Sequence, residues 1–78
     1  MVRQKIEGSS NITESGYDHE NMTLEIKFHN GKIYQNWPIT LKKYRGFIES
    51  KSKGSFFASE IKNNPRINFK QLDGEIQS

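Results

Sequence analysis

A β-hairpin is the clearest element of the sequence, and it lies in residues 23–38, which read TLEIKFHNGKIYQNWP. The first six residues alternate strictly between polar and apolar side chains, which is the period of a strand with one buried face. Asn30-Gly31 is the dipeptide that most often supplies the two positive φ angles of a two-residue hairpin turn. The chain is therefore expected to return antiparallel through residues 33–37, a β-branched and aromatic run closed by Pro38, which cannot donate to a strand ladder.

A third strand is expected upstream of this hairpin, because two strands alone are only marginally stable. Residues 10–17, which read SNITESGY, supply a weaker strand that reaches residues 23–28 through a polar turn at residues 18–21. Together these segments predict a small three-stranded antiparallel β-meander.

Two helices are expected after the hairpin, where the apolar period changes from two residues to 3.6. One helical stripe contains Leu41, Tyr44, Phe47 and Ile48. Thr40 stands where a threonine caps a helix N-terminus. A shorter helix is predicted over residues 56–62, after an interruption at residues 52–55 and before the proline at position 65. Strands followed by helices indicate an α+β domain, with the two helices packed on one face of the sheet.

The predicted boundaries divide the chain into three parts. Residues 1–8 form an N-terminal extension, residues 9–66 form the domain, and residues 67–78 form a C-terminal tail. In the tail, Ile67 and Phe69 are expected to dock as a short edge segment, whereas residues 73–78 are expected to fray.

Length and composition exclude several classes of protein. A single domain of 78 residues buries only roughly 60% of the surface that its unfolded form exposes, which leaves little room for a deep, enclosed active site. The lack of cysteine excludes a disulfide framework, a thiolate zinc site and a cysteine nucleophile. The first eight residues lack the apolar run of a signal peptide, and no stretch approaches the ~20 apolar residues of a membrane span. We expect a cytoplasmic monomer without membrane association, metal or cofactor.

The net charge of +3 is unevenly distributed along the chain. Residues 1–39 contain four basic and five acidic side chains, a net charge of −1. Residues 40–78 contain eight basic and four acidic side chains, a net charge of +4. This asymmetry suits a polyanion-binding surface, but a lysine-rich solvated surface has the same composition.

The chain from residue 9 to about residue 65 resembles the KTSC family, a short module found as a stand-alone bacterial or phage protein and at the C-terminus of some lysyl-tRNA synthetases. The order and spacing of the matching pieces carry the resemblance. They are Ser9-Ser10-Asn11-Ile12, Gly16-Tyr17-Asp18, residues 23–28 with Asn30-Gly31, Ile33-Tyr34, Tyr44, and residues 52–57 with Ile61.

The resemblance implies RNA binding, which is the activity proposed for that family. The chain departs from the family pattern at one informative position. The family usually has a central Tyr-x-Tyr, whereas this chain has Tyr34-Gln35-Asn36, with Trp37 one position later and facing the other side of the strand. If the two tyrosines form a stacking platform in the family, this chain retains half of it.

Residues 52–55, Ser-Lys-Gly-Ser, allow two interpretations. Free backbone N–H groups, two hydroxyls and a lysine at the start of a helix can together hold a phosphate or carboxylate. Alternatively, Gly54 supplies a positive φ between two helices while Ser52 or Ser55 caps the second. The Walker spacing of a P-loop is absent.

The aromatic residues also allow two interpretations. Tyr17, Tyr34, Trp37 and Tyr44 can stack on unpaired bases while the phosphates meet Lys32, Lys42, Lys43 and Arg45. The same rings can instead form much of a small core, and Tyr44, which lies within the apolar helical stripe, favours the core.

Asp18-His19-Glu20 combines two carboxylates with an imidazole, as metal and acid–base sites do. Three consecutive turn residues cannot easily converge on one ion, and the only other histidine, His29, precedes the hairpin turn. The triplet therefore favours a solvated turn over a site.

These observations favour a non-catalytic, nucleic-acid-binding module that prefers RNA or another polyanion. The alternative is a protein-interaction module of a bacterial or phage protein, docking through its sheet face or an exposed strand edge. No catalytic nucleophile with a base and an orienting group stands at useful spacing, so we do not expect an enzyme. The candidate RNA contacts are Tyr34, Lys42, Lys43, Arg45, Lys51, Ser52, Lys53, Gly54, Ser55 and Lys62.

Overall fold

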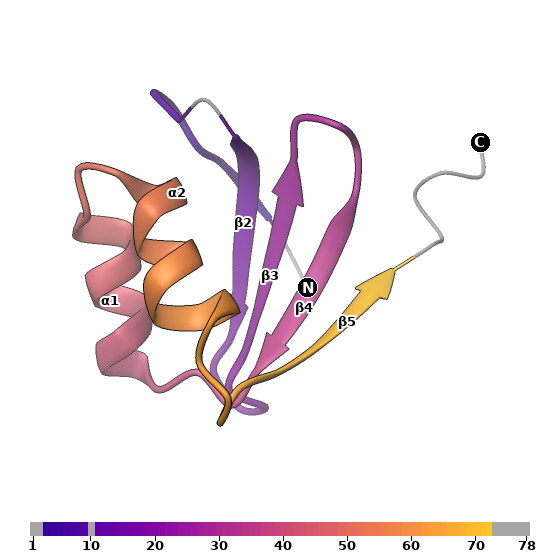
Figure 1. Ribbon diagram of the computed structural model, residues 1–78, viewed down its shortest axis with the longest axis vertical. Helices are drawn as coiled ribbons and strands as arrows, with labels where there is room; N and C mark the ends of the chain where they lie inside the picture. Colours follow the sequence, from indigo (N-terminus) through magenta and orange to yellow (C-terminus); the bar gives the residue numbers. More distant parts are fainter. Residues whose placement is uncertain (1–2, 10, 73–78) are drawn as a thin grey trace.

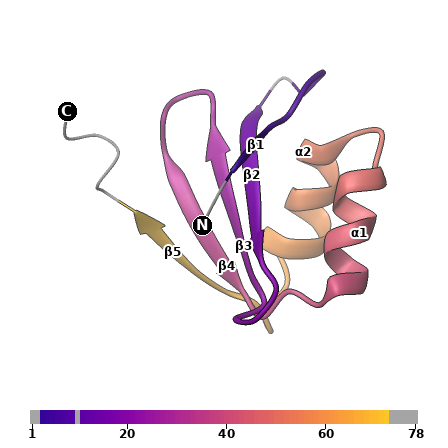
Figure 2. The same cartoon turned by 180° about the vertical axis from the view of Figure 1, so that it is seen from behind.

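A computed structural model of the chain describes residues 3–9 and 11–72. It contains one antiparallel sheet whose five strands follow one another in chain order, with the helices on one face (Figure 1). Seen from behind, the opposite face has no helix over it (Figure 2). The strands are β1 (Gln4–Lys5), β2 (Ile12–Asp18), β3 (Thr23–Phe28), β4 (Ile33–Trp37) and β5 (Asn68–Leu72). The helices are α1 (Leu41–Glu49), the short α2 (Lys53–Phe56) and the π-helix η1 (Phe57–Lys62), which continues α2.

The α+β class and the antiparallel meander are confirmed, but the prediction of three strands is wrong because the sheet has five. β1 lies within the predicted N-terminal extension and pairs Gln4 with Ser15 and Lys5 with Glu14. Two exposed residues show no periodicity, so this strand could not be predicted from the sequence. β5 is the expected edge segment and pairs with β4 along its whole length. The predicted fraying of residues 73–78 lies outside the described residues.

The central hairpin forms as predicted, but its turn differs. β3 and β4 pair Leu24 with Asn36 and Ile26 with Tyr34. Phe28 N–H donates to the Lys32 carbonyl at 2.9 Å, so the loop comprises the three residues 29–31. Gly31 has a φ of 88°, whereas Asn30 is not in the left-handed region and its side chain accepts from Lys32 N–H. A three-residue loop needs only one left-handed position, and the glycine occupies it.

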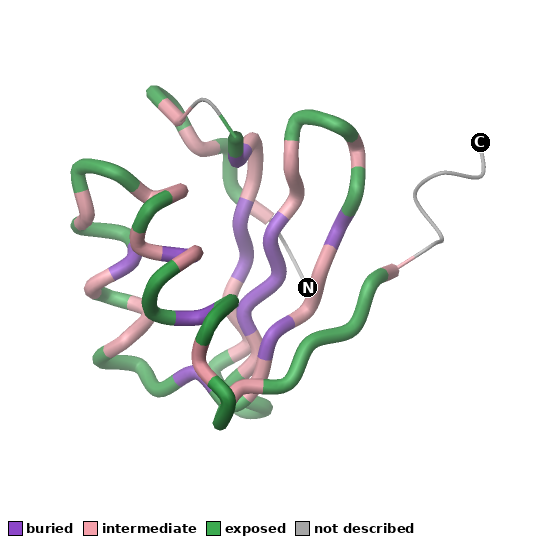
Figure 3. Tube along the Cα trace, viewed as in Figure 1, coloured by how far each residue is buried: buried purple, intermediate pink, exposed green. Residues whose placement is uncertain are grey.

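The core lies between the helices and the β2–β3 part of the sheet (Figure 3). Its buried members are Ile12, Leu24, Ile26, Ile39, Phe47, Phe57 and Ile61. The predicted buried stripe of α1 is only partly correct. Phe47 is fully buried and Tyr44 stacks on Tyr17 with ring centroids 4.3 Å apart, whereas Leu41 and Ile48 are exposed. Leu41 and Ile48 are seven residues apart and so share one margin of the stripe, which faces away from the sheet.

The second helix begins three residues before its predicted start. Lys53, Gly54 and Ser55 belong to α2, and Gly54 has ordinary helical backbone rather than a positive φ. The helix continues as η1, where Asn63 N–H donates to the Ala58 carbonyl at 3.2 Å, a five-residue spacing. Gly46 lets α2 approach α1 closely, since a Cβ at that position would lie 3.2 Å from the Phe56 ring. The predicted end of the helix before Pro65 is confirmed.

The face of the sheet opposite the helices carries a polar network. The Arg3 guanidinium donates to Glu14 at 2.9 Å and to Glu25 at 2.6 Å. The Gln35 amide donates to the other oxygen of Glu25 at 3.1 Å. Glu25 is buried, and its carboxylate is paired with the Arg3 guanidinium and hydrogen-bonded to the Gln35 amide, as a buried charge requires. This network ties the N-terminal segment to three strands.

Candidate functional site

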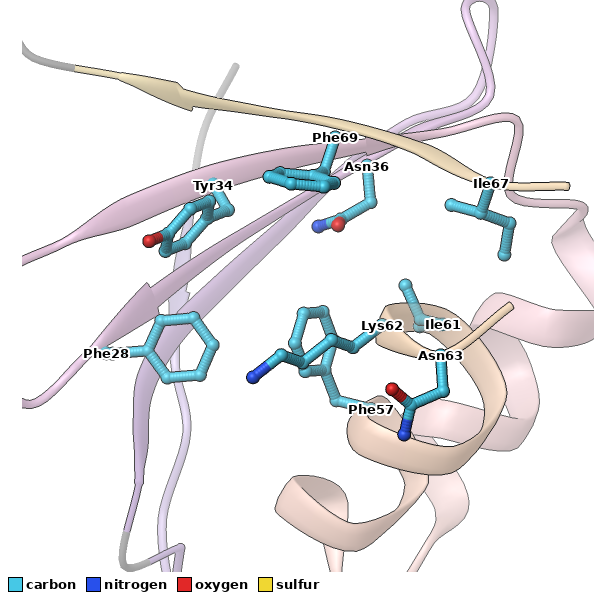
Figure 4. A pocket seen from close by; sticks show the side chains of 9 residues that line it. All are labelled: Phe28, Tyr34, Asn36, Phe57, Ile61, Lys62, Asn63, Ile67 and Phe69. Atoms are coloured by element: carbon cyan, nitrogen blue, oxygen red, sulfur yellow. The ribbon is translucent and has the colours of Figure 1, made fainter. Parts of the chain in front are cut away.

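An aromatic cleft of about 420 Å³ opens on the helix-bearing face of the sheet. It exists because the helices lie over β2 and β3, while β4 and β5 extend beyond them on the same side (Figure 1). β4 and β5 supply one wall, and the end of β3 with η1 supplies the other (Figure 4). The lining residues are Phe28, Tyr34, Asn36, Phe57, Ile61, Lys62, Asn63, Ile67 and Phe69. We call this space the aromatic cleft.

Four aromatic rings form a continuous edge-to-face series along the aromatic cleft. Phe69 meets Tyr34 with ring centroids 6.2 Å apart, Tyr34 meets Phe28 at 5.9 Å, and Phe28 meets Phe57 at 5.6 Å. These distances and the interplanar angles of 61–76° are those of favourable aromatic pairs. The series runs from the exposed edge strand β5, where Phe69 is 68% exposed, to Phe57 in the core. A flat ring can therefore enter beside Phe69 and meet aromatic surface throughout.

Asn36 is the most buried polar side chain of the aromatic cleft, with 2% of its surface exposed. Its Nδ2 donates to the backbone carbonyl of Leu24 at 3.2 Å. Because a carbonyl can only accept, this bond fixes which end of the amide faces β3. The Oδ1 atom has no hydrogen-bond donor among the described residues, and the close-up shows the amide directed between the two walls (Figure 4).

Lys62 is the one charged side chain among the residues that line the aromatic cleft. It is exposed at the end of η1, and no carboxylate of the described residues pairs with it. Asn63 follows it at the same rim. The aromatic cleft thus combines apolar walls, a buried amide and a cationic rim, without a carboxylate in its lining.

A second, smaller cleft of about 180 Å³ is almost wholly polar, and we call it the polar cleft. It is lined by Glu7, Gly8, Ser9, Asn11, Lys51, Ser52, Lys53, Gly54 and Ser55. The structure thus brings the predicted Ser-Lys-Gly-Ser segment against residues 7–9 and Asn11. The backbone N–H of Ser52 is taken by the Ser50 hydroxyl at 3.1 Å, and the Lys53 ammonium donates to the Ser50 carbonyl at 3.1 Å. Two groups expected to hold an anion therefore have intramolecular partners.

The comparisons with known proteins identify the family and support the fold. The family model described as the KTSC domain matches residues 8–64, most of the chain. The chain belongs to the KTSC domain family. A crystal structure of a KTSC domain protein from Yersinia pestis is similar, with a TM-score of 0.80 and 30% sequence identity over 92% of this chain and 97% of that one. A search of curated proteins found no match.

The predicted contact residues of this KTSC domain fall in three separate places. Tyr34 and Lys62 lie in the aromatic cleft, and Lys51 to Ser55 lie in the polar cleft. Lys42 and Arg45 are exposed on α1 and line neither cleft. Lys43 also belongs to α1, but its ammonium reaches η1, where it contacts the Glu60 carbonyl at 3.2 Å and the Glu60 carboxylate at 3.6 Å. The predicted set is therefore not one continuous surface.

The Asp18-His19-Glu20 triplet comprises the last residue of β2 and the first two residues of the turn to β3. The Asp18 carboxylate accepts hydrogen bonds from the side chain and backbone of Asn21 and from the backbone of Glu20. The side-chain bond from Asn21 is the main reason that the pKa of Asp18 is lowered. The described residues contain no group of three or more His, Cys, Asp or Glu side chains that could hold a metal ion. None of their helices has the length and apolar character needed to cross a membrane.

Sequence reasoning missed most of the aromatic cleft of this KTSC domain. Tyr34 and Lys62 were candidates, but Phe28, Asn36, Phe57 and Phe69 were not. Alternation predicts one buried face for residues 23–28 but does not say which face of β4 meets the helices. The pairing of Leu24 with Asn36 puts Asn36 on the helix-facing side. No local signal reveals that a residue near position 28 meets others near 57 and 69, because that encounter depends on β5 pairing with β4 and on η1 reaching the end of β3.

Proposed function

We propose that this KTSC domain is a non-catalytic module that binds single-stranded RNA through the aromatic cleft. The observation that carries the proposal is the series of four rings that runs from the exposed Phe69 inward, with Lys62 at the rim. Proteins hold single-stranded nucleic acid by stacking bases on aromatic side chains while cations track the phosphates. Both elements are present here within one cleft.

Charge supports the same ligand. The chain has a net charge of +3, and its excess of basic residues lies in residues 40–78, which supply the helices and β5. Such a field attracts polyanions from solution and raises their rate of encounter. Lys42 and Arg45 on α1 contribute to this long-range attraction, whereas Lys62 is placed for direct contact. An RNA ligand also accords with the cytoplasmic location expected from the cysteine-free sequence.

The lining of the aromatic cleft supports the proposal of binding without catalysis. Its polar groups are a tyrosine hydroxyl, two amides and an ammonium, set among aromatic and aliphatic side chains. Acid–base or nucleophilic chemistry needs a nucleophile oriented by a partner of suitable pKa. A site that stacks bases beside a cationic rim needs only the side chains that line the aromatic cleft.

The test is an amide chemical-shift titration with a short mixed-sequence single-stranded RNA, first at low and then at moderate salt. Shifts should concentrate at Tyr34, Phe57, Lys62 and Phe69, and binding should weaken with salt because each neutralised phosphate releases counterions. Shifts confined to α1 or the polar cleft would overturn this placement of the site.

A matched pair of charge reversals sharpens the test. Lys62→Glu and Lys42→Glu change the net charge equally, and both lysines are exposed on helices. If the aromatic cleft is the site, Lys62→Glu weakens binding clearly more than Lys42→Glu does. Equal losses would indicate a diffuse electrostatic surface. No RNA binding at low salt, together with a protein ligand whose binding shifts β5, would favour the alternative of a protein-docking edge, for which Phe69 is sufficiently exposed.

A further inference from the structure

Asn36 has an unusual position for a polar side chain. Only 2% of its surface is exposed, yet one of its two polar side-chain atoms, Oδ1, has no hydrogen-bond donor among the described residues. No fully enclosed side-chain oxygen or nitrogen of the described residues lacks a partner, so Oδ1 is not sealed in the core and opens to the aromatic cleft that Asn36 lines. A ligand that fills the cleft without donating to Oδ1 would leave this acceptor buried and unpaired, which is costly, whereas a ligand that donates to it avoids that cost.

The orientation of this acceptor is fixed by the fold. Leu24 and Asn36 are direct partners in the β3–β4 ladder, and the Leu24 carbonyl takes the Nδ2 hydrogen at 3.2 Å. Rotating the amide by 180° would set two oxygen acceptors against each other. The aromatic cleft therefore presents an acceptor oxygen to a flat ring that enters between the Tyr34–Phe69 wall and the Phe57 wall (Figure 4).

The geometry points to a single-base subsite that selects a nucleobase carrying an exocyclic amino group, the amino group donating to Asn36 Oδ1. This inference rests on the proposed RNA binding and adds a base preference to it. The cleft volume of about 420 Å³ lies in the range of small-ligand pockets and admits one base with part of its sugar. Lys62 stands at the rim, where the adjoining phosphate would lie.

The chemistry of the four bases explains the preference. Adenine, cytosine and guanine each carry an amino group at their edge, which can donate to a deep acceptor. Uracil offers only its ring N3–H, which lies between two carbonyl oxygens. Presenting that N–H to Oδ1 would bring both carbonyls against an acceptor and the apolar walls without donors for them. Polar groups left unpaired in this way lower affinity more than a gained hydrogen bond raises it.

The experiment measures binding of five-nucleotide RNAs to the full chain by fluorescence anisotropy at low salt. The ligands are UUUUU, UUAUU, UUCUU and a fourth in which purine riboside, adenosine without its amino group, replaces the central adenosine. UUAUU and UUCUU should bind roughly three- to tenfold tighter than UUUUU, as one net hydrogen bond allows. The purine-riboside RNA should lose this advantage over UUUUU although it retains a purine ring.

Asn36→Leu tests whether the preference for a base with an amino group comes from Asn36 Oδ1. The variant should bind UUAUU and the purine-riboside RNA equally, because the acceptor is gone while the aromatic walls remain. The comparison with purine riboside on the unaltered protein keeps the inference testable even if Asn36→Leu does not fold. Equal binding of all four RNAs by the unaltered protein would overturn the base preference and leave the proposed function standing. If none of the four RNAs binds, both the base preference and the proposed function are overturned.

Discussion

Phe69 contributes to the aromatic cleft while adding little to the core. Its side chain is 68% exposed on β5, and its one ring contact among the described residues is the edge-to-face pair with Tyr34. Phe69→Ala should change the free energy of unfolding by less than about 0.5 kcal/mol, as exposed substitutions do. If a base stacks there, RNA affinity should fall by ~1–3 kcal/mol, the usual worth of one stacked base. Urea denaturation and RNA titration measure the two effects separately.

Ile48→Ala is the matched control for this change. Ile48 is also a partly exposed apolar residue, but it lies on α1 and does not line the aromatic cleft. Its replacement should leave RNA affinity unchanged. An equal loss of affinity in the two variants would show that Phe69 acts through general surface properties and would remove it from the site.

Tyr17 makes the stability of the domain sensitive to alkaline pH. Burial, followed by the negative charge of Asp18 and the neighbouring Tyr44, raises the pKa of Tyr17 above its ordinary value of 10.0. The folded state therefore favours the protonated phenol, whose hydroxyl donates to the Ile39 carbonyl at 2.6 Å. The corresponding stability is complete below pH 10 and is lost as the pH rises through the higher folded-state pKa.

The measurement is urea unfolding of the native protein and Tyr17→Phe between pH 8 and pH 11. At pH 8, Tyr17→Phe should be less stable by about 1 kcal/mol, the net worth of a hydrogen bond. Above pH 10 the difference should shrink, since the native protein loses a contribution that the variant lacks. Parallel curves across the whole range would contradict this role for the hydroxyl.

The N-terminus of α1 is an element that the sequence predicts in detail. Thr40 was expected to cap it, and the Thr40 hydroxyl indeed accepts from the Lys43 N–H at 3.1 Å. Thr40→Ala should lower the free energy of unfolding by about 1 kcal/mol, while Thr40→Ser should retain most of it. Because Thr40 lies outside the aromatic cleft, RNA affinity should not change in either variant. Thermal and urea unfolding of the three proteins checks the order.

Elements with local determinants could be predicted, and elements that depend on partners could not. The β3–β4 hairpin and the start of α1 follow from alternation, a glycine in the turn and a capping threonine within a few residues of one another. β1 has two exposed residues, and it is held by pairing with β2 and by Arg3, beside it, which reaches Glu14 and Glu25. The π-helix spacing of η1 likewise has no sequence signature that distinguishes it from an α-helix.

The candidate site follows the same division. Tyr34 and Lys62 could be selected by residue type, because rings and cations suit RNA. Their grouping with Phe28, Phe57 and Phe69 could not, because it joins segments about 30 residues apart in the sequence through packing. Lys42, Lys43 and Arg45 were selected for charge alone, and charge does not reveal which face of a helix lies beside a cleft.

The whole molecule divides into a folding core and a strand that completes the aromatic cleft. All residues of the buried core cluster lie between Ile12 and Ile61, and the family match ends at residue 64, before β5 begins. A chain ending at Ile67 should therefore still unfold cooperatively. Its free energy of unfolding should fall by on the order of 2 kcal/mol, because Ile33 loses its β5 neighbour and becomes partly exposed. Circular dichroism and urea denaturation measure both properties.

The same truncation separates the fold from RNA binding. Without β5 the aromatic cleft loses Phe69 and the β5 part of one wall, so RNA affinity should fall at least as far as in Phe69→Ala. A chain ending at Leu72 is the control, since it retains β5 and should bind RNA like the full chain. If the chain ending at Ile67 folds and binds RNA with unchanged affinity, the aromatic cleft is not the RNA site. If it does not fold, β5 belongs to the cooperative core, and the loss of β5 lowers the free energy of unfolding by more than the exposure of Ile33 accounts for.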